Sequence, residues 1–434
     1  MKKIIISAIG IAILIGCQKQ PLQENVIEQD ATLSTGASNR TVAPSILQWQ
    51  KCFGSTADDL GYSITKASDG SGYFVAGYTV GSDGKQDAMV MKISLNGNLT
   101  WQTIVRGSAW DEAAAVVATP DGGCLVAGYT QSNDGDVFGK GGGDVLLFKL
   151  SANGNKEWVK TIGGTGYDRA FSLIATVDGK YVLTGNTTSV DGDVTGSNVI
   201  GGAKAWIVKF DNVSGLPVIE WQKTLGISGS KDDVGYSVVQ DPVNGDYIIA
   251  GRTLNDATSA DILVMKVAAD GSFLWSKTIS SPLGDVAFSA SISAGSGYLV
   301  TGYYNANSLI TVKFFTNGDI NWSKTFKAST ANAIHGRNVF GSGQGVIITG
   351  FTDSKNGELI ASKGGGDMFV LQLDDATGNK ISSHILGGKG NDVARSLVPT
   401  DDGMYFSAGY TTSNNGDVSG NHGLSDFWIV KFKF

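Results

Sequence analysis

The sequence predicts an all-β protein that folds as a single seven-bladed β-propeller, and three observations support this prediction. A short motif of a small residue, Gly, usually an aromatic residue and usually Thr occurs seven times, at intervals of 48 to 66 residues. Each copy stands among short apolar runs separated by Gly-rich turns. The chain also enters the repeats in the middle of one unit and leaves them in the middle of another. The motif glycines are Gly77, Gly128, Gly185, Gly251, Gly302, Gly350 and Gly409.

The N-terminus predicts export. Lys2 and Lys3 precede an apolar run of 12 residues from Ile4 to Ile15, which is too short to span a bilayer. The run ends in Leu14-Ile15-Gly16-Cys17, which resembles the lipobox of bacterial lipoproteins. In that motif the cysteine carries the lipid and becomes the new N-terminus.

Residues 1–17 are therefore expected to be a lipoprotein signal peptide with its lipobox. Gln18 follows the cysteine where an Asp would favour retention in the inner membrane, so we expect an outer-membrane lipoprotein. Residues 18–44 are polar and without periodicity, and we expect a flexible tether there. Residues 45–434 are expected to form the propeller.

The first two strands of each unit, named A and B, are recognised by their motifs. Strand A opens with Asp-x-(Ala or Gly)-x-Ser in five copies, nearly so at Asp111, and not in the sixth copy, which has Ile334. A tight turn, often Asp-Gly, leads to strand B, which contains the motif glycine. Because glycine weakens a strand, seven in register indicate a close backbone approach, which we expect where blades pack near the axis.

Strands C and D complete the unit. Strand C is almost continuously apolar, as in Asp426–Lys431, which indicates burial on both faces. Strand D begins with Trp in six copies, whereas the seventh has Ser382 there. The chain enters on a D strand at Trp49–Phe53 and leaves on a C strand at Asp426–Phe432. We therefore expect the first strand to complete the last blade and close the ring.

The long loops between strands B and C are expected to share one face with the D–A connections. Variable loops on a rigid scaffold commonly carry binding, so this face is the predicted binding face. The loops are 131–143, 189–203, 353–366 and 412–425.

With these motifs assembled, the chain resembles the β-propeller repeats of secreted and lipid-anchored proteins of Gram-negative bacteria. The likeness rests on stretches such as Trp221–Gly226, Asn415–Val418 and Asp426–Lys431, and it covers residues 49 to 434. It implies a location in the cell envelope, periplasmic or surface-exposed, but no particular activity. A weaker likeness to quinoprotein propellers rests on a turn glycine followed by Trp, as in Gly154 and Trp158, and implies that Trp packs one blade on the next.

Two aromatic residues break the repeat pattern in D–A loops, Trp110 and Tyr167, each beside an acid, Asp111 or Asp168. Exposed aromatic rings next to carboxylates suit sugar binding, so these four residues are the predicted ligand contacts. The alternative is that the rings pack on neighbouring loops. An Asp that recurs in nearly every blade also suits a structural role, capping backbone amides between blades.

Acidic pairs around a glycine in the long loops suggest calcium, which prefers carboxylate oxygens. The alternative, which we favour, is that these side chains cap their own loop backbone. No other cofactor is expected. The predicted calcium ligands are Asp134, Asp136, Asp191, Asp193 and Asp417.

The composition and motifs narrow the function. A net charge of −7 argues against a nucleic-acid partner. No serine-hydrolase elbow or zinc-helix motif occurs. Cys52 and Cys124 occupy packing positions in different strand contexts, so a disulfide between them is the less favoured possibility.

We expect a non-enzymatic binding or scaffolding module for a glycan or an envelope protein, attached to the membrane through its lipid. One alternative is a propeller-type enzyme, either a glycan hydrolase or lyase or, less readily, a quinone-dependent protein. The other is a component of outer-membrane assembly. The fold alone does not decide among these.

Overall fold

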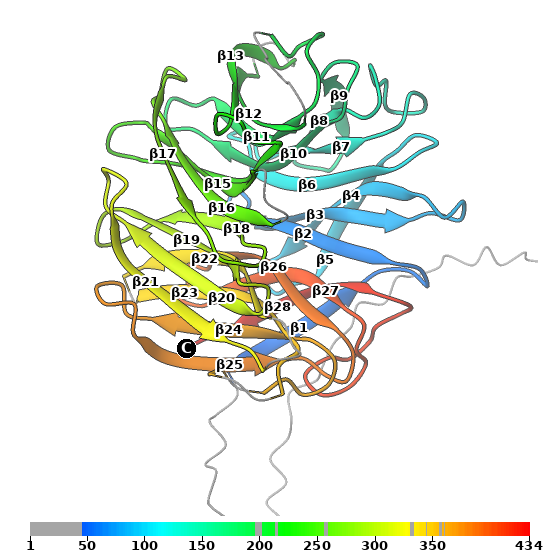
Figure 1. Cartoon of the computed structure of the whole chain (residues 1–434). Coiled ribbons are helices and arrows are strands. Elements are labelled where there is room, and N and C mark those ends of the chain that lie inside the picture. The colour runs from blue at the N-terminus through cyan, green and yellow to red at the C-terminus, as the bar shows by residue number, and fades with distance from the viewer. Residues whose placement is uncertain are drawn as a thin grey trace, which may run out of the picture.

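A computed structural model describes residues 46–195, 202–212, 216–255, 259–329, 334–343, 345–355, 358–359 and 361–434. These residues form 28 strands in seven four-stranded antiparallel sheets, which Figure 1 shows arranged around a ring. The predicted seven-bladed propeller is confirmed. None of the described residues belongs to a helix long and apolar enough to cross a membrane. Cys17 and the predicted tether lie outside the described residues.

Each blade takes its strands A to D in chain order. The first four blades are β2 (Asp59–Lys66), β3 (Gly72–Val80), β4 (Gln86–Ser94) and β5 (Leu99–Val105); β6 (Asp111–Ala118), β7 (Cys124–Thr130), β8 (Val145–Leu150) and β9 (Lys156–Ile162); β10 (Asp168–Ala175), β11 (Tyr181–Thr187), β12 (Lys204–Asp211) and β13 (Val218–Leu225); and β14 (Asp232–Gln240), β15 (Tyr247–Leu254), β16 (Ala260–Val267) and β17 (Phe273–Ile279).

The remaining blades follow the same order, except that the last one borrows a strand from the start of the chain. They are β18 (Val286–Ile292), β19 (Tyr298–Tyr304), β20 (Ser308–Phe314) and β21 (Ile320–Lys327); β22 (Ile334–Ser342), β23 (Gly345–Thr352), β24 (Asp367–Leu373) and β25 (Lys380–Leu386); and β26 (Asp392–Pro399), β27 (Tyr405–Thr411) and β28 (Asp426–Phe432) with β1 (Leu47–Phe53).

The ring closes as the sequence predicts. Strand β1 pairs antiparallel with β28, and the register places Cys52 opposite Trp428. The indole nitrogen of Trp428 donates a hydrogen bond of 2.9 Å to Gln50. In Figure 1 the blue β1 lies beside the red end of the chain, so the two ends of the fold share one sheet.

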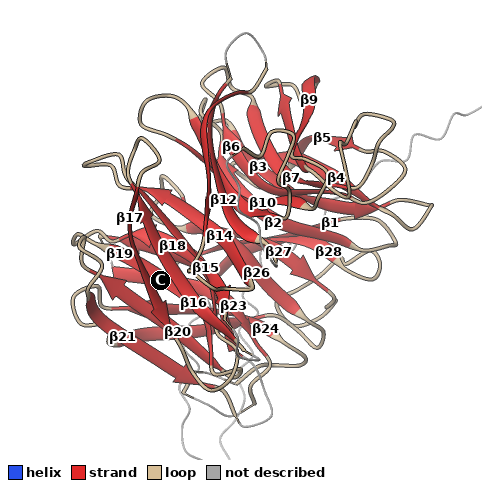
Figure 2. Cartoon of the chain, turned by 45° about the horizontal axis from the view of Figure 1, so that its top comes forward, coloured by secondary structure: helices blue, strands red, loops and turns tan. Residues whose placement is uncertain are grey.

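The A strands form the inner wall of the ring, and each contacts the A strand of the next blade, including β26 against β2 (Figure 2). The core lies between blades. One apolar cluster, for example, joins Phe74 and Val90 of the first blade to Val126 and Phe148 of the second. Strand β8 is buried along its whole length, which confirms that C strands are covered on both faces.

Every A strand carries a β-bulge at the same place. In the first blade Gly61 pairs with Gly77 and Ser63 pairs with Ala76, so Tyr62 is an extra residue without a partner on strand B. The same shift occurs in the other six blades. The bulged residues are Tyr62, Ala114, Phe171, Tyr236, Phe288, Arg337 and Arg395.

The bulge explains the motif glycine. A Cβ atom on Gly77 would lie 1.8 Å from the carbonyl oxygen of Leu60, on the strand A of the same blade. The other motif glycines face the equivalent carbonyl group in their own blades. The predicted close approach is therefore confirmed, but its cause is different from the expected one. The tightest contact comes from the bulged strand within each blade, and at Gly77 the ring of Phe427 in the neighbouring blade adds a contact at 2.9 Å.

The Trp residues that begin the D strands pack one blade on the next, as predicted. The ring of Trp101 lies against Gly154 in the C–D turn of the following blade, where a Cβ atom would come within 2.6 Å of the ring. Gly154 also has a φ of 81°, which favours glycine. The indole nitrogen of Trp101 donates a 3.0 Å hydrogen bond to the carbonyl of Ala152 in the same turn.

Candidate functional site

The seven bulges aim their side chains at the ring axis, where they enclose a cavity of about 220 Å³, called here the axial cavity. A bulge leaves its extra residue outside the ladder and re-aims its side chain, which explains why these positions face the axis. Glu112 and Arg169, each two residues before a bulged residue, complete the lining. The full lining is Tyr62, Glu112, Ala114, Arg169, Phe171, Tyr236, Phe288, Arg337 and Arg395.

One side of the axial cavity is an aromatic wall. The ring centroids of Phe171 and Tyr236 are 4.9 Å apart, and those of Tyr236 and Phe288 are 5.7 Å apart. These distances are typical of favourable aromatic pairs. Three consecutive blades therefore present one continuous apolar surface to the axis.

The rest of the axial cavity is basic. Arg169 forms an ion pair with Glu112, the one carboxylate among the described lining residues. Arg337 lies 4.1 Å over the ring of Phe288, and Arg395 lies 5.5 Å over the ring of Tyr62. The lining thus has three guanidinium groups and one carboxylate, so the cavity is electropositive inside an acidic protein.

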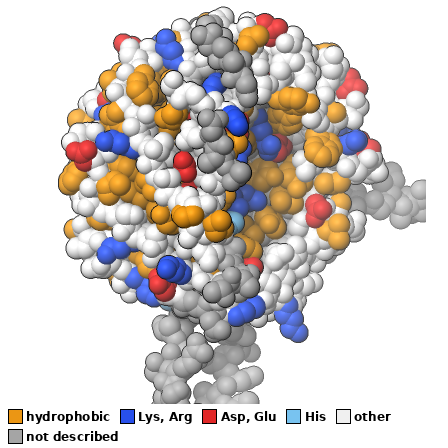
Figure 3. All heavy atoms as spheres, in the orientation of Figure 1, with side chains coloured by type: hydrophobic (Ala, Val, Ile, Leu, Met, Phe, Trp, Pro, Cys, Tyr) orange, Lys and Arg blue, Asp and Glu red, His pale blue; other side chains and the backbone are white. Residues whose placement is uncertain are grey.

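A second cavity of about 240 Å³, called here the mouth cavity, continues the first toward solvent. The two share Tyr62, Glu112 and Arg169, and the mouth cavity reaches Trp110, whose side chain is 50% exposed. Figure 3 shows a hollow near the middle of one face, where hydrophobic, basic and histidine side chains meet. Together the two cavities reach the size range of small-molecule sites, roughly 300–1,000 Å³.

His335 lies beside the axial cavity and is neutral at physiological pH. Its imidazole stacks on the ring of Tyr303 with 4.9 Å between centroids. Burial, with the nearby Arg337 guanidinium as the next cause, lowers the pKa of His335 to about 4. A neutral imidazole adds no positive charge to the site and can offer one hydrogen-bond donor and one acceptor.

Of the four residues predicted to contact a ligand, Trp110 and Asp111 line the mouth cavity. Tyr167 is 55% exposed but does not line it, and its ring lies against Gly142 in the adjacent B–C loop. Asp111 and Asp168 are completely buried. The structure therefore gives the two aromatic residues different surroundings and places both carboxylates inside the fold.

Asp111 illustrates the role of these repeated acids. Its carboxylate accepts hydrogen bonds from the Gly107 amide at 2.7 Å, the Thr130 hydroxyl at 2.5 Å and the Ser132 hydroxyl at 2.9 Å. Asp168 has the equivalent partners Gly164, Thr187 and Ser189. Each Asp thus ties a D–A loop to the B strand and B–C loop of the blade that it opens, which supports the structural role.

A second buried Asp faces this one at several blade junctions. At the junction of the sixth and seventh blades, Asp367 of strand C lies beside Asp392 of strand A, and one oxygen of Asp367 is buried without a hydrogen-bond partner. Burial, reinforced by the Asp392 carboxylate, raises the pKa of Asp367 to about 6. At the third junction Lys204 replaces the first acid and donates a 2.9 Å hydrogen bond to Asp233.

The acids predicted to bind calcium instead accept hydrogen bonds from backbone amides of the preceding D–A loop. Asp134 accepts the Ser108 amide at 2.7 Å. Asp191 accepts the Thr165 amide at 2.8 Å, and the other three have similar amide partners as well as ion pairs with lysines. Among the described residues no group of three or more His, Cys, Asp or Glu is arranged to hold a metal. Calcium binding therefore stays a prediction. The contacts support a capping role, but the capped amides belong to the preceding D–A loop and not to the acids' own loop.

Cys52 and Cys124 are fully buried and are not joined to each other by a disulfide. Burial raises the pKa of the Cys124 thiol to about 12. A buried thiol of this kind behaves as a small apolar side chain and is not reactive.

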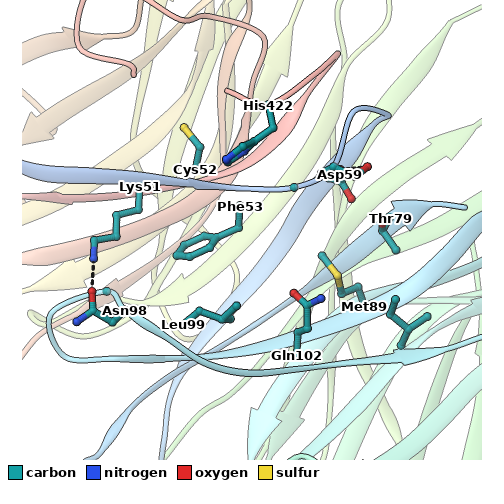
Figure 4. A pocket seen from close by; sticks show the side chains of 14 residues that line it. Lys51, Cys52, Phe53, Asp59, Thr79, Met89, Asn98, Leu99, Gln102 and His422 are labelled. Carbon is teal, nitrogen blue, oxygen red and sulfur yellow. Dashed lines mark hydrogen bonds between the residues drawn. The ribbon is translucent and has the colours of Figure 1, made fainter. Parts of the chain in front are cut away.

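A larger cavity of about 780 Å³ lies between the outer strands β1 and β5 (Figure 4). Its walls include Phe53, Met89 and Leu99, and Lys51 donates a 2.5 Å hydrogen bond to Asn98 across it. The short segment 81–85 links β3 to β4 beside this cavity, and His422 of the long loop 412–425 lines it. Its one lysine or arginine is Lys51, which is already bonded to Asn98, whereas three arginines line the axial cavity, and we assign the site to the axis.

The sequence reasoning placed binding on the loop face and missed the basic and aromatic residues of the axis. One signal was available in the motif Asp-x-(Ala or Gly)-x-Ser. Its second x is the bulged position, and it changes chemistry from blade to blade while its neighbours stay constant, from Tyr62 to Ala114 to Arg395. A position that varies while its motif stays constant can place a different functional group on the axis in each blade.

Neither the models of known protein families nor the sequences of curated proteins match this chain. Solved structures are similar in fold. Sqt1 from Chaetomium thermophilum has a TM-score of 0.50 at 11% identity, with 90% of this chain and 99% of that chain covered. The S511A mutant of puromycin hydrolase complexed with PGG has a TM-score of 0.51 at 12% identity, with 82% and 51% covered, so this chain spans about half of its length.

Periplasmic gluconolactonase PpgL of Pseudomonas aeruginosa has a TM-score of 0.47 at 13% identity, with 86% of this chain and 100% of that chain covered. At such low identities these likenesses show the fold alone. The functions of these proteins differ from one another, so the function of this chain has to be argued from its own residues.

Proposed function

We propose that this protein is a non-enzymatic binding module of the bacterial cell envelope, attached to the outer membrane through a lipid on Cys17. We further propose that its ligand is a glycan bound at the mouth cavity. The observation that carries this proposal is the half-exposed Trp110, which stands at the entrance of a cavity walled by aromatic rings and guanidinium groups. An aromatic ring stacks on the apolar face of a sugar, while nearby polar groups bond its hydroxyls.

The composition of the site favours binding over glycoside hydrolysis. Glycosidases commonly need two carboxylic groups, one to act as acid and one as base or nucleophile. In the described lining of the two cavities, Glu112 is held by Arg169 and Asp111 is saturated by three donors. Both carboxylates are therefore engaged by groups of the protein itself.

A glycan array tests the proposal. The chain from residue 45 onward is applied with and without EDTA, beside two variants of it. Trp110→Ala is expected to lose saturable binding because it removes the exposed ring at the entrance. Phe273→Ala is the matched control, because Phe273 is a similarly exposed aromatic residue on the outer strand β17.

The outcomes separate the candidates. Binding that Trp110→Ala abolishes and Phe273→Ala preserves supports the glycan module. Binding lost in EDTA in addition would support calcium in the B–C loops. A blank array for the unmodified protein in both conditions would contradict the glycan proposal and favour an envelope protein as the partner, to be sought by affinity capture from the envelope.

A further inference from the structure

Two basic side chains of the axial cavity have no anionic partner. Arg337 and Arg395 are the bulged residues of neighbouring blades, and both line the cavity. No described carboxylate lies within ion-pair distance of either guanidinium, in contrast to Arg169 and its partner Glu112. The Nε atoms of Arg337 and Arg395 are buried and have no hydrogen-bond partner in the described structure.

Aromatic rings support these cations without neutralising them. Arg337 lies over Phe288, and Arg395 lies between Tyr62 and Tyr410 at 5.5 and 5.8 Å from their ring centroids. Burial, reinforced by the charge of Arg395, lowers the pKa of Arg337 to about 9, so the Arg337 guanidinium remains charged at neutral pH. Two like charges that are partly removed from water are unfavourable unless a counter-charge joins them.

We infer that the axial cavity is an anion site, in which Arg337 and Arg395 bind the carboxylate or phosphate group of an acidic sugar. This inference rests on the proposed glycan-binding function and specifies its ligand class. Guanidinium groups present paired N–H donors that match the oxygens of carboxylate and phosphate. The wall of Phe171, Tyr236 and Phe288 then contacts the apolar part of the same ligand.

Isothermal titration calorimetry on the full-length chain in detergent tests the inference. The probes are glucuronate, glucose 6-phosphate, neutral glucose and inorganic phosphate. At least one acidic sugar is expected to bind at least tenfold more tightly than glucose. Arg337→Gln and Arg395→Gln should each weaken that binding at least tenfold. Arg106→Gln is the matched control, because Arg106 is exposed on a D–A loop and its loss changes the net charge equally.

The probes distinguish the source of the anion. Glucuronate alone would identify a carboxylate ligand, whereas glucose 6-phosphate together with inorganic phosphate would identify a phosphorylated one. Equal affinity for glucose and both acidic sugars would overturn the anion site and leave the glycan proposal standing. Array binding by glycans without any acidic group would do the same, and a blank array with blank titrations would contradict both.

Thermal stability gives an independent readout. Arg337→Gln removes an uncompensated charge, so its melting temperature should equal or exceed that of the unmodified chain. Inorganic phosphate should raise the melting temperature of the unmodified chain and not that of Arg337→Gln or Arg395→Gln. A shift of equal size in all three proteins would show that phosphate acts elsewhere and would overturn the inference.

Discussion

The motif glycine allows a close backbone approach to be predicted from the sequence, but not the group that approaches. Seven glycines in register predict that something approaches the B strands closely, and this is correct. They do not predict what approaches, because a β-bulge has no residue signature of its own in this motif. The carbonyl group of Leu60 meets Gly77 only because the chain inserts Tyr62 two residues later.

This close approach predicts a large effect of a small substitution. Gly77→Ala should lower the free energy of unfolding by about 3 kcal/mol, because the added Cβ atom meets a backbone oxygen that cannot move without breaking the ladder. Denaturant unfolding measures the change. Gly343→Ala is the control, because Gly343 is exposed, has no atom within 4 Å of an added Cβ and should change stability by less than about 0.5 kcal/mol. A loss of the same size in both variants would contradict the steric explanation.

The candidate site was only partly predictable at this scale. Trp110 stood out because it departs from its repeat, and it lines the mouth cavity. Arg337 and Arg395 did not stand out, because regular alternation along strand A would not single out their position. The bulge breaks that alternation and turns these two residues toward the axis.

At the scale of the strands, the ends of strands C and A meet in a constant arrangement at the blade junctions. Five junctions combine two acids, one combines Lys204 with Asp233, and one combines Ser308 with Ile334. The acid of strand A therefore never lacks a partner that can share a proton or supply a charge. At the five junctions with two acids, burial, reinforced by the carboxylate of strand A, raises the pKa of the strand C acid.

The sixth junction offers a test through pH. The pKa of Asp367 rises to about 6 in the folded protein from 3.8, so the folded state binds more protons than the unfolded state between these values. Stability from this group is therefore present at low pH and is lost as pH rises through about 6. Asp367→Asn removes this loss, and it should be more stable than the unmodified chain at pH 8 by about 1–3 kcal/mol, with little difference at pH 4.

Denaturant unfolding from pH 4 to pH 8 measures this difference, and the comparison between variants matters. Burial of His335 acts in the opposite sense, because its lowered pKa costs stability as pH falls toward about 4, and it affects both chains equally. Asp401→Asn is the control, since Asp401 is exposed and its loss should not create a pH-dependent gain. A constant difference between Asp367→Asn and the unmodified chain across this range would contradict the raised pKa of Asp367.

The strands themselves were largely predictable, and their loops were not. Alternating apolar residues, Asp-Gly turns and apolar C strands act locally, so each strand was expected close to its observed place. The acids of the B–C loops suggested a ligand because their hydrogen-bond partners lie in another blade unit. Asp134 and Asp191 bind amides of D–A loops some 26 residues earlier, which no local pattern reveals.

At the scale of the whole molecule, closure of the ring depends on one strand from the start of the chain. A chain that begins at residue 54 lacks β1 and exposes the edge of β28, including Trp428, which β1 covers. We expect this truncation to lose cooperative unfolding or to aggregate, whereas a chain that begins at residue 45 should keep both the fold and its melting temperature. Circular dichroism melts and size-exclusion chromatography measure this, and equal melting temperatures would show that β1 is dispensable.

The net charge of the whole molecule is negative, whereas the lining of the axial cavity is positive. The net charge of −7 correctly describes the surface average, and it argued against a polyanion partner. It could not predict a basic axis, because three arginines contribute little to a total over 434 residues. Only the ring arrangement gathers Arg169, Arg337 and Arg395, which are far apart in the sequence, around one cavity.

The bulge has a consequence for how such a protein changes over evolution or in the hands of a designer. Because the bulged residue has no partner in the ladder, its identity is uncoupled from the pairing that holds the blade together. The seven bulged residues, such as Ala114, Phe171 and Arg395, can therefore be substituted one at a time without a change in strand pairing. If the axial cavity binds a ligand as proposed, its specificity can change through substitutions at these seven positions without a change of fold.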